Sequence, residues 1–442
     1  MKVSLAFAFL CIFISVLRAP AQDHVSLEDA IVLALQKNYD VQLSRNISES
    51  AATDDSYAWA AYMPQLNAVG SAVWNNNQQK LEFQDETRNN SGDAQSNVLN
   101  GSVQLNWLLF DGTRMFATRE RIRQIAEQGE IAVKAQMVNT VADVIVNYHG
   151  IVRQKQQLKA LEEQMAVSEE RVKLAEKKLE VGTGGKPELL QAKVDLNAFK
   201  TQVIQQEALI IQFKETLNEL TGLQLSKSYD VADTIIIDLN LNLDDIQNNI
   251  ENSNFDLLAA KRNFEIAQLS LRERKAELSP TISFNASYNY GRTDNQKLIN
   301  PFAALLSTSQ GYNYGFSINV PIFNALNTRR LIEQAHIDYG RQEILYQQQK
   351  ANVDVGLRNA FVNYDNAKKV LLIEEENILL AKENVFIALE GFKRGITTFI
   401  ELRTAQQSLA DGYNRLINAR FLAKVAETEL LRLKGTLIQW TE

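Results

Sequence analysis

The chain has 442 residues, of which 45% are apolar and 22% charged, and its formal net charge is −7. This composition excludes a disordered chain and a bundle of membrane-spanning helices, and the acidic balance argues against a nucleic-acid binder. The single cysteine, Cys11, excludes a disulfide framework and a Cys-based zinc site. Only 6 prolines and 19 glycines occur, which favours long uninterrupted helices.

The N-terminus has the pattern of a secretory signal peptide. Lys2 precedes an apolar run over 3–17, and small residues at 19 and 21 form a cleavage site. A buried N-terminal helix is the alternative. We expect residues 1–21 to be the signal peptide. No later apolar stretch approaches the roughly 20 residues of a transmembrane helix, so strands would have to cross any membrane.

Self-comparison predicts two repeats, 22–222 and 223–442. Positions near the start of each repeat match at an offset of 216, whereas Gly182 matches Gly395 at an offset of 213. The three-residue difference falls in a polar loop. A tandem duplication therefore replaces the roughly three domains that the length alone suggests.

Each repeat contains two segments in which apolar and polar residues alternate. They predict strands at about 65–76 and 101–110, and at about 281–292 and 311–323. A transmembrane β-barrel and a soluble sheet with one buried face both fit this period. The polar face is Asn, Ser and Gln with very few charges, which favours the wall of a wet lumen.

Apolar residues at strict heptad spacing predict two long coiled-coil hairpins, at about 113–222 and 326–435. A helix of roughly 68 residues before the first tip would be about 100 Å long. The first helix of the mature chain is expected to begin at Ser26 and to end before Pro64.

The number of strands predicts the oligomer. Four strands cannot close a barrel, and an open edge cannot face lipid. Two copies give eight strands and a filled interior, whereas three give twelve and leave room for a channel. We therefore expect a mainly α fold with a β-barrel portion: a homotrimeric 12-stranded outer-membrane barrel continuous with an α-helical periplasmic tunnel.

An ordered set of motifs carries a family resemblance. The set consists of Val25–Ile31 leading to Asn38, Leu109–Gly112, Val320–Phe323 and a Gly-x-x-x-x-x-Glu-Leu pattern at both hairpin tips. It resembles the TolC-like outer-membrane efflux proteins over essentially the whole mature chain. The resemblance implies a Gram-negative outer-membrane channel that passively conducts drugs or secreted proteins. Its partners would be outer-membrane lipid, a periplasmic adaptor (membrane-fusion) protein and an inner-membrane RND or ABC transporter.

The resemblance also implies a periplasmic entrance just past the second tip. Glu401 lies where family members often carry an acidic ring, and Glu188 is its counterpart in the first repeat. Thr404 and Thr397 replace a frequent second carboxylate and a latching Arg, and Arg403 is adjacent. A single carboxylate ring is therefore expected. The alternative is that Glu401 is only an acid at a helix N-terminus.

Both hairpin tips would contact the adaptor in such a family. The expected contact residues are Val181, Gly182, Thr183, Gly184, Arg394, Gly395 and Ile396. Alternatively, the two glycines at equivalent positions are only helix C-caps.

Enzyme activity is not expected. The 3 histidines have neither repeat partners nor metal-ligand spacing, so no catalytic residue, metal site or cofactor is predicted. A structural or adhesive coiled-coil protein of the envelope without a pore is the alternative to the channel.

Overall fold

The computed structural model describes residues 24–225, 229–300 and 302–440, so the predicted signal peptide lies outside the described residues. In these ranges no helix is both long and apolar enough to cross a membrane. The chain divides into two compact units. The first contains the described residues of Met1–Asn46, Ile131–Leu258 and Gln348–Glu442, and the second contains those of Ile47–Glu130 and Ala259–Gln347. Each unit therefore takes segments from both sequence repeats.

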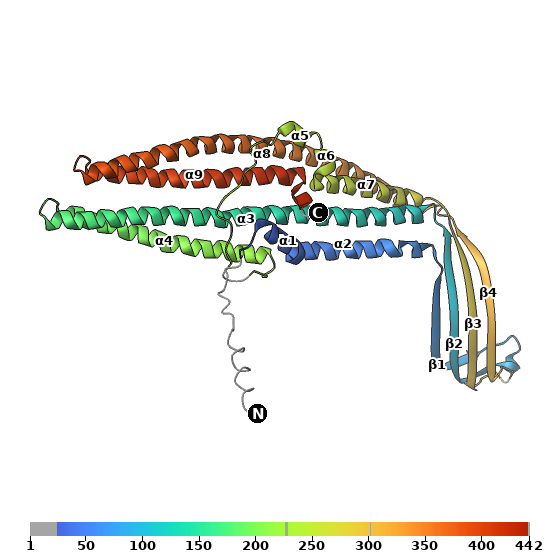
Figure 1. Ribbon diagram of the computed structural model, residues 1–442. Helices are drawn as coiled ribbons and strands as arrows, with labels where there is room; N and C mark the ends of the chain where they lie inside the picture. Colours follow the sequence, from blue (N-terminus) through green and yellow to red (C-terminus); the bar gives the residue numbers. More distant parts are fainter. Residues whose placement is uncertain (1–23, 226–228, 301, 441–442) are drawn as a thin grey trace, which may run out of the picture. The chain divides into compact units, whose positions relative to one another are not determined.

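The second unit holds a four-stranded antiparallel sheet in the order β1-β2-β3-β4 (Figure 1). The strands are β1 Gln65–Leu81, β2 Asn90–Phe110, β3 Thr281–Lys297 and β4 Leu306–Asn319. The central pair β2–β3 joins the two repeats, with Ser102 opposite Asn289. Among the described residues, the outer edges of β1 and β4 have no partner strand.

The strand boundaries differ from those expected. Three strands extend further into segments that read as polar loops, because ladder pairs such as Asn76–Gln95 use the backbone whatever the polarity of the side chain. The expectation of a fourth strand at 311–323 is wrong in position, since β4 is Leu306–Asn319. Pro321 lacks an N–H for a ladder, which accounts for the earlier end.

Two helices of 67 residues follow the strands, α3 Arg114–Glu180 and α8 Asn327–Lys393. At 1.5 Å per residue each is about 100 Å long. Each junction from strand to helix contains two consecutive left-handed residues. These are Gly112 and Thr113 (φ 73° and 72°) and, at the equivalent positions, Ala325 and Leu326 (φ 55° and 61°).

The helical hairpins predicted from the heptads are present in the first unit. After each tip, the chain returns as α4 Lys186–Leu220 beside α3 and as α9 Phe399–Lys434 beside α8 (Figure 1). Most of the buried α9 residues lie at the predicted heptad positions: Leu402, Ala405, Gly412, Leu416, Ala419, Ala423, Leu430 and Leu433. Small residues at several of these positions let the two backbones approach closely.

The first helix begins as predicted but is shorter than expected. The Ser26 Oγ accepts the Asp29 N–H at 3.1 Å at the start of α1 Leu27–Lys37. A single helix to Pro64 is wrong, because Asn38 interrupts it. Its Oδ1 accepts the N–H of Asp40 at 3.0 Å and caps α2 Tyr39–Tyr57.

The amide of Asn38 also fastens this break to the end of the first hairpin. Its Nδ2 donates to the Leu220 carbonyl at 3.1 Å. The second repeat has the same device before α7 Phe255–Ala276, where Asn254 Nδ2 donates to the Leu433 carbonyl at 2.9 Å. The short elements are η1 Ala58–Tyr62, η2 Glu86–Arg88, α5 Leu243–Gln247, α6 Ile250–Ser253 and η3 Leu437–Trp440.

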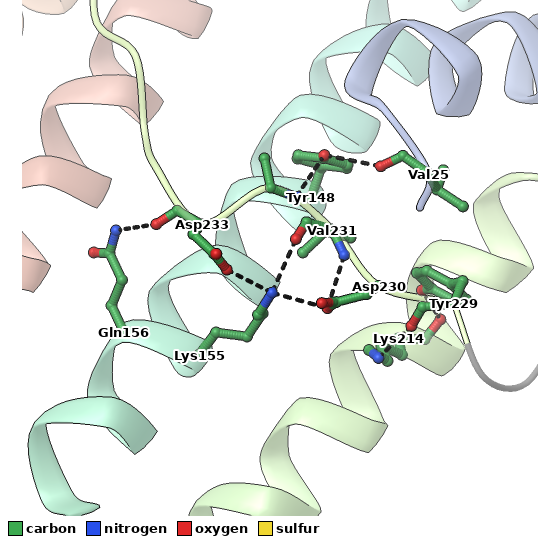
Figure 2. Close-up of polar contacts among 10 residues, drawn as sticks. Val25, Tyr148, Lys155, Gln156, Lys214, Tyr229, Asp230, Val231 and Asp233 are labelled. Atoms are coloured by element: carbon green, nitrogen blue, oxygen red, sulfur yellow. Dashed lines mark hydrogen bonds and ion pairs between the residues drawn. The ribbon is translucent and has the colours of Figure 1, made fainter. Parts of the chain in front are cut away.

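An extended strap, residues 229–241 near the start of the second repeat, is fastened to α3 (Figure 2). The Lys155 Nζ lies 2.8 Å from Asp230 Oδ1 and 2.7 Å from Asp233 Oδ1, and it donates to the Val231 carbonyl at 2.9 Å. The Tyr148 hydroxyl donates to the Val25 carbonyl at 3.0 Å. The start of the described chain and the strap therefore meet on one face of α3.

The far end of the strap is fastened to the second hairpin. The Tyr364 hydroxyl of α8 donates to the Asp238 carbonyl at 2.7 Å and accepts the Leu241 N–H at 3.3 Å. Lys368 donates to the Leu239 carbonyl at 2.5 Å. The strap thus ties α3 to α8 within the first unit.

Candidate entrance site at the hairpin tips

The two hairpin tips adopt the same turn. Gly182 and Gly395 are left-handed, with φ of 76° and 75°. The N–H of Thr183 donates to the Lys178 carbonyl, and the N–H of Ile396 donates to the Gly391 carbonyl, both at 2.9 Å. Each hydrogen bond spans five residues and closes the helix end.

The turn geometry explains why glycine occurs at these two positions. A Cβ added to Gly182 or Gly395 would meet nothing within 4 Å, so the positive φ and not crowding within the chain requires glycine. The cap role is therefore seen directly. Adaptor contact stays a prediction for the tips, where Val181 and Ile396 are 70% and 77% exposed.

The Glu401 carboxylate caps its own helix. Its Oε2 accepts the Thr398 N–H at 2.7 Å, and the Thr398 Oγ1 accepts the Glu401 N–H at 3.3 Å. These hydrogen bonds, with the Thr398 backbone first, hold the pKa of Glu401 below its usual value. The carboxylate is exposed and charged at neutral pH, so a cap and an entrance acid are compatible roles.

Within the described chain, each of the other expected entrance residues has local contacts of its own. Glu188 lies in the first turn of α4, but the N-cap residue of this helix is Gly185, which has no side chain to form a capping hydrogen bond. Thr404 Oγ1 donates to the carbonyl of Ile400 at 3.0 Å, within its own helix. Thr397 lies in the tip turn, where its N–H donates to the Gly391 carbonyl at 3.2 Å.

Arg403 makes an ion pair between the two hairpins. Its Nε lies 3.4 Å from Oδ2 of Asp195 on α4, and its Nη2 donates to Asp195 Oδ1 at 3.4 Å. The Asp195 side chain is only 14% exposed. The sequence placed Arg403 beside the entrance, but it did not predict this partner.

A buried arginine shares that carboxylate. The Nη2 of Arg171 on α3 lies 2.5 Å from Asp195 Oδ2, and its Nη1 donates to Gln406 Oε1 on α9 at 3.1 Å. Its guanidinium lies 5.0 Å from the ring centre of Phe399. The Arg171 side chain is only 3% exposed, and its Nε has no hydrogen-bond partner among the described residues.

Arg171, Asp195, Arg403 and Gln406 form one group, which we call the Arg171 cluster. It joins the first hairpin to the second within about two turns of the helix start after the second tip. A buried charge that loses its partner is strongly destabilising, by about 3–5 kcal/mol. The cluster therefore makes it costly to separate the two hairpins near the second tip.

Sequence reasoning missed Arg171, Asp195 and Gln406. Their equivalents at the 213-residue offset are Asn384, Ser408 and Lys193, so the repeat gives no signal for them. The partners also lie on three different helices.

A protein-family model described as outer membrane efflux protein matches residues 30–223 and 246–436. The outer membrane protein TolC of Vibrio cholerae serotype O1 is 22% identical, over 86% of this chain and 83% of that protein. The cation efflux system protein CusC of Escherichia coli strain K12 is 21% identical, over 91% of this chain and 84% of that protein.

A solved structure shares the fold. The CmeC outer membrane channel of Campylobacter jejuni superposes with a TM-score of 0.77 at 16% identity, covering 92% of this chain and 85% of that one. The predicted family resemblance, the mainly helical fold with its four strands, the export function and the outer-membrane location are confirmed. The chain belongs to the outer membrane efflux protein family.

Proposed function

We propose that three copies of this chain form a passive export channel that works with a periplasmic adaptor and an inner-membrane transporter of the RND or ABC class. The four-stranded sheet, whose two edges have no partner strand in the described part of the chain, carries the proposal. An open edge leaves backbone donors and acceptors unsatisfied in lipid, so the sheets of several copies have to close on one another.

The two faces of the sheet suit lipid and water. Tyr312, Phe316 and Ile318 lie on one face of β4 and are 67–78% exposed in the single chain. The intervening side chains hydrogen-bond across the sheet: Asn285 Nδ2 donates to Ser317 Oγ at 3.0 Å, and a similar bond links Ser287 to β4. This uncharged polar ladder fits the wall of a wet lumen.

The Arg171 cluster supports a closed resting entrance. It joins the hairpins near their tips, so an opening motion has to break its ion pairs. The exposed tips, including Val181 and Ile396, are available to an adaptor. Adaptor contact that favours separated hairpins would offset the cost of breaking the cluster, which is a shift of a two-state equilibrium.

Glu401 would supply one carboxylate per copy to the entrance. Its lowered pKa, caused by the Thr398 hydrogen bonds, keeps it ionised at neutral pH. Three such carboxylates around an axis would attract cations.

Purified protein tests the proposal directly. We expect the mature chain to have the mass of three copies in detergent and to release a small dye from proteoliposomes. A monomer that releases no dye would contradict it and would favour the pore-free envelope protein. Crosslinking in cells from a photoreactive residue at Thr183 or Thr397 should recover a periplasmic adaptor, whereas the same probe at the exposed Thr201 of α4 should not.

A further inference from the structure

An apolar cavity lies where the two helical hairpins of the chain meet, a contact that we call the joint. Its volume is about 110 Å³. All four hairpin helices line it: Val167 of α3, Phe199 of α4, Val385 of α8, and Leu409 and Tyr413 of α9. An empty apolar cavity lowers stability in proportion to its volume. A molecule that fills the cavity would therefore recover part of that loss.

The cavity exists only while the two hairpins are joined. Its lining includes Glu163 and Gln406, and both take part in hydrogen bonds across the joint. The Tyr413 hydroxyl of α9 donates to Glu163 Oε2 of α3 at 2.8 Å. The Nη1 of Arg171 on α3 donates to Gln406 Oε1 of α9 at 3.1 Å. Because the walls come from both hairpins, separating the hairpins would open the cavity to water.

The lining favours an uncharged occupant. Apolar walls offer a charged ligand nothing to replace its hydration. Among the described residues, Glu163 provides the only charged side chain of the lining, and the Tyr413 hydroxyl already binds it. Burial, and then the hydrogen bond to Glu163, raises the pKa of Tyr413 to about 12. The tyrosine is therefore neutral at physiological pH and adds no charge to the wall.

Two amide side chains of the lining can bind one polar atom of a ligand. Gln406 uses its Oε1 for Arg171, which leaves its Nε2 as a donor without a partner among the described residues. Gln164 also lines the cavity, and its amide makes no hydrogen bond within the described chain. An apolar pocket with a few polar groups is the usual form of a small-molecule site.

The size of the cavity selects a single ring. In another protein, an engineered apolar cavity of ~150 Å³ binds benzene, so this smaller cavity has room for one six-membered ring and little more. The rings of Phe199 and Tyr413 can pack against an aromatic guest. A neighbouring groove of about 280 Å³ shares Gln164, Phe199 and Gln406 with the cavity. Rotation of these side chains would admit a guest from the groove.

We propose that the cavity binds one small uncharged aromatic molecule of the size of phenol, with its hydroxyl bound to the amide of Gln164 or Gln406, and that this occupant holds the two hairpins together. A ligand that binds only the joined state stabilises that state by mass action. In the proposed channel such a ligand would oppose opening of the entrance, a consequence that rests on the proposed function.

Binding of para-fluorophenol, followed by fluorine NMR of the detergent-solubilised protein, tests the site. We expect Val167→Phe, which puts a ring into the cavity, to weaken binding about tenfold or more. Val167→Ile adds one methyl group, disturbs the fold least and should weaken binding severalfold. Val194→Phe is the matched control: Val194 is 62% exposed on α4 and outside the lining, so this variant should bind like the wild type and report uptake by detergent.

Hydrogen exchange of the backbone amides at 399–409 measures the effect on the joint. At a probe concentration of about ten times the Kd, exchange in the wild type should slow about tenfold, because only the joined state binds the probe. Exchange in Val167→Phe should not change. Equal binding by the wild type and both Val167 variants, or binding that leaves exchange in the wild type unchanged, would overturn the proposal. Binding and slower exchange in a protein that forms no pores would support the cavity site and overturn the export channel.

Discussion

The proposed closure of the entrance depends on Arg171, because its buried guanidinium has one carboxylate partner among the described residues, Asp195. Asp195→Ala leaves that charge unpaired, whereas Arg403→Gln removes a side chain that is 54% exposed. We expect Asp195→Ala to weaken the joint by about 3–5 kcal/mol and Arg403→Gln by no more than about 1 kcal/mol. Hydrogen exchange of the backbone amides at 399–409 measures this weakening. The exchange rate should rise about a hundredfold or more in Asp195→Ala. Equal exchange in both variants would contradict the role of the cluster.

Glu401 is expected to bind cations at the entrance. Glu401→Ala should weaken block of the pore by divalent cations, and Glu188→Ala should change it less. The lowered pKa sets the pH dependence: the carboxylate stays charged as pH falls to its usual pKa of about 4.3, and block disappears only as pH falls through the lower value. Unchanged block in Glu401→Ala would remove this residue from the entrance.

Some residues of the candidate site could be predicted from the sequence and others could not. Glu401, Arg403 and the tip glycines stood out because short motifs and the repeat mark them. Arg171 and Asp195 did not, since their contact depends on how two hairpins pack and the second repeat has no equivalent of it.

Among the elements, the junctions between strand and helix form a matched pair. Gly112 tolerates its φ of 73°, and a Cβ there would lie 2.4 Å from the Ser279 Cβ. Ala325 adopts φ 55° with a side chain, which costs about 1–2 kcal/mol. Ala325→Gly should therefore be neutral or raise the melting temperature by a few degrees, and Gly112→Ala should lower it. A lower melting temperature for Ala325→Gly would refute the strain at this junction.

The strap should detach from α3 when Lys155 loses its charge or its partners Asp230 and Asp233 lose theirs. Burial opposes both charges, but the ion pairs prevail: the pKa of Asp230 is lowered and that of Lys155 is raised. The Asp230 contribution is present above its unfolded pKa of about 3.9 and is lost as pH falls through the folded value. The Lys155 contribution is present below about 10.4 and is lost as pH rises through its folded value.

Hydrogen exchange of the Val25 and Ala232 amides measures the attachment of the strap, because the Val25 N–H donates to the Asp230 carbonyl and the Ala232 N–H donates to the Tyr148 hydroxyl. We expect faster exchange in Lys155→Met and below pH 4, and no change in Lys159→Met, an exposed lysine on the same helix. Protection that persists in Lys155→Met would show that the Lys155 ion pairs are not needed to hold this end of the strap on α3, where Tyr148 also binds it.

The elements themselves were largely predictable. Heptads gave both hairpins, because a long helix pair has to bury one apolar stripe. The ends of the strands were not predictable, because Asn and Gln side chains on a strand look the same in sequence as those of a polar loop. The break at Asn38 was also missed, because its cause is a hydrogen bond to Leu220, which is distant in sequence.

For the whole molecule, one rule applies to both units: each leaves surfaces that a single chain cannot satisfy. Among the described residues, the sheet has two edges without a partner strand, and the hairpins leave apolar side chains exposed, such as Ile204 on α4 and Ile373 on α8. Counting the strands predicted three copies, because the four strands of one chain cannot close a barrel.

Single-channel recording in planar bilayers tests the central claim, that this chain forms an export channel held closed at its periplasmic entrance by the Arg171 cluster. We predict that the purified wild-type trimer inserts and shows a small conductance, and that Asp195→Ala increases it several-fold. A purified trimer that forms no pores, with the cluster either intact or disrupted, would contradict the account.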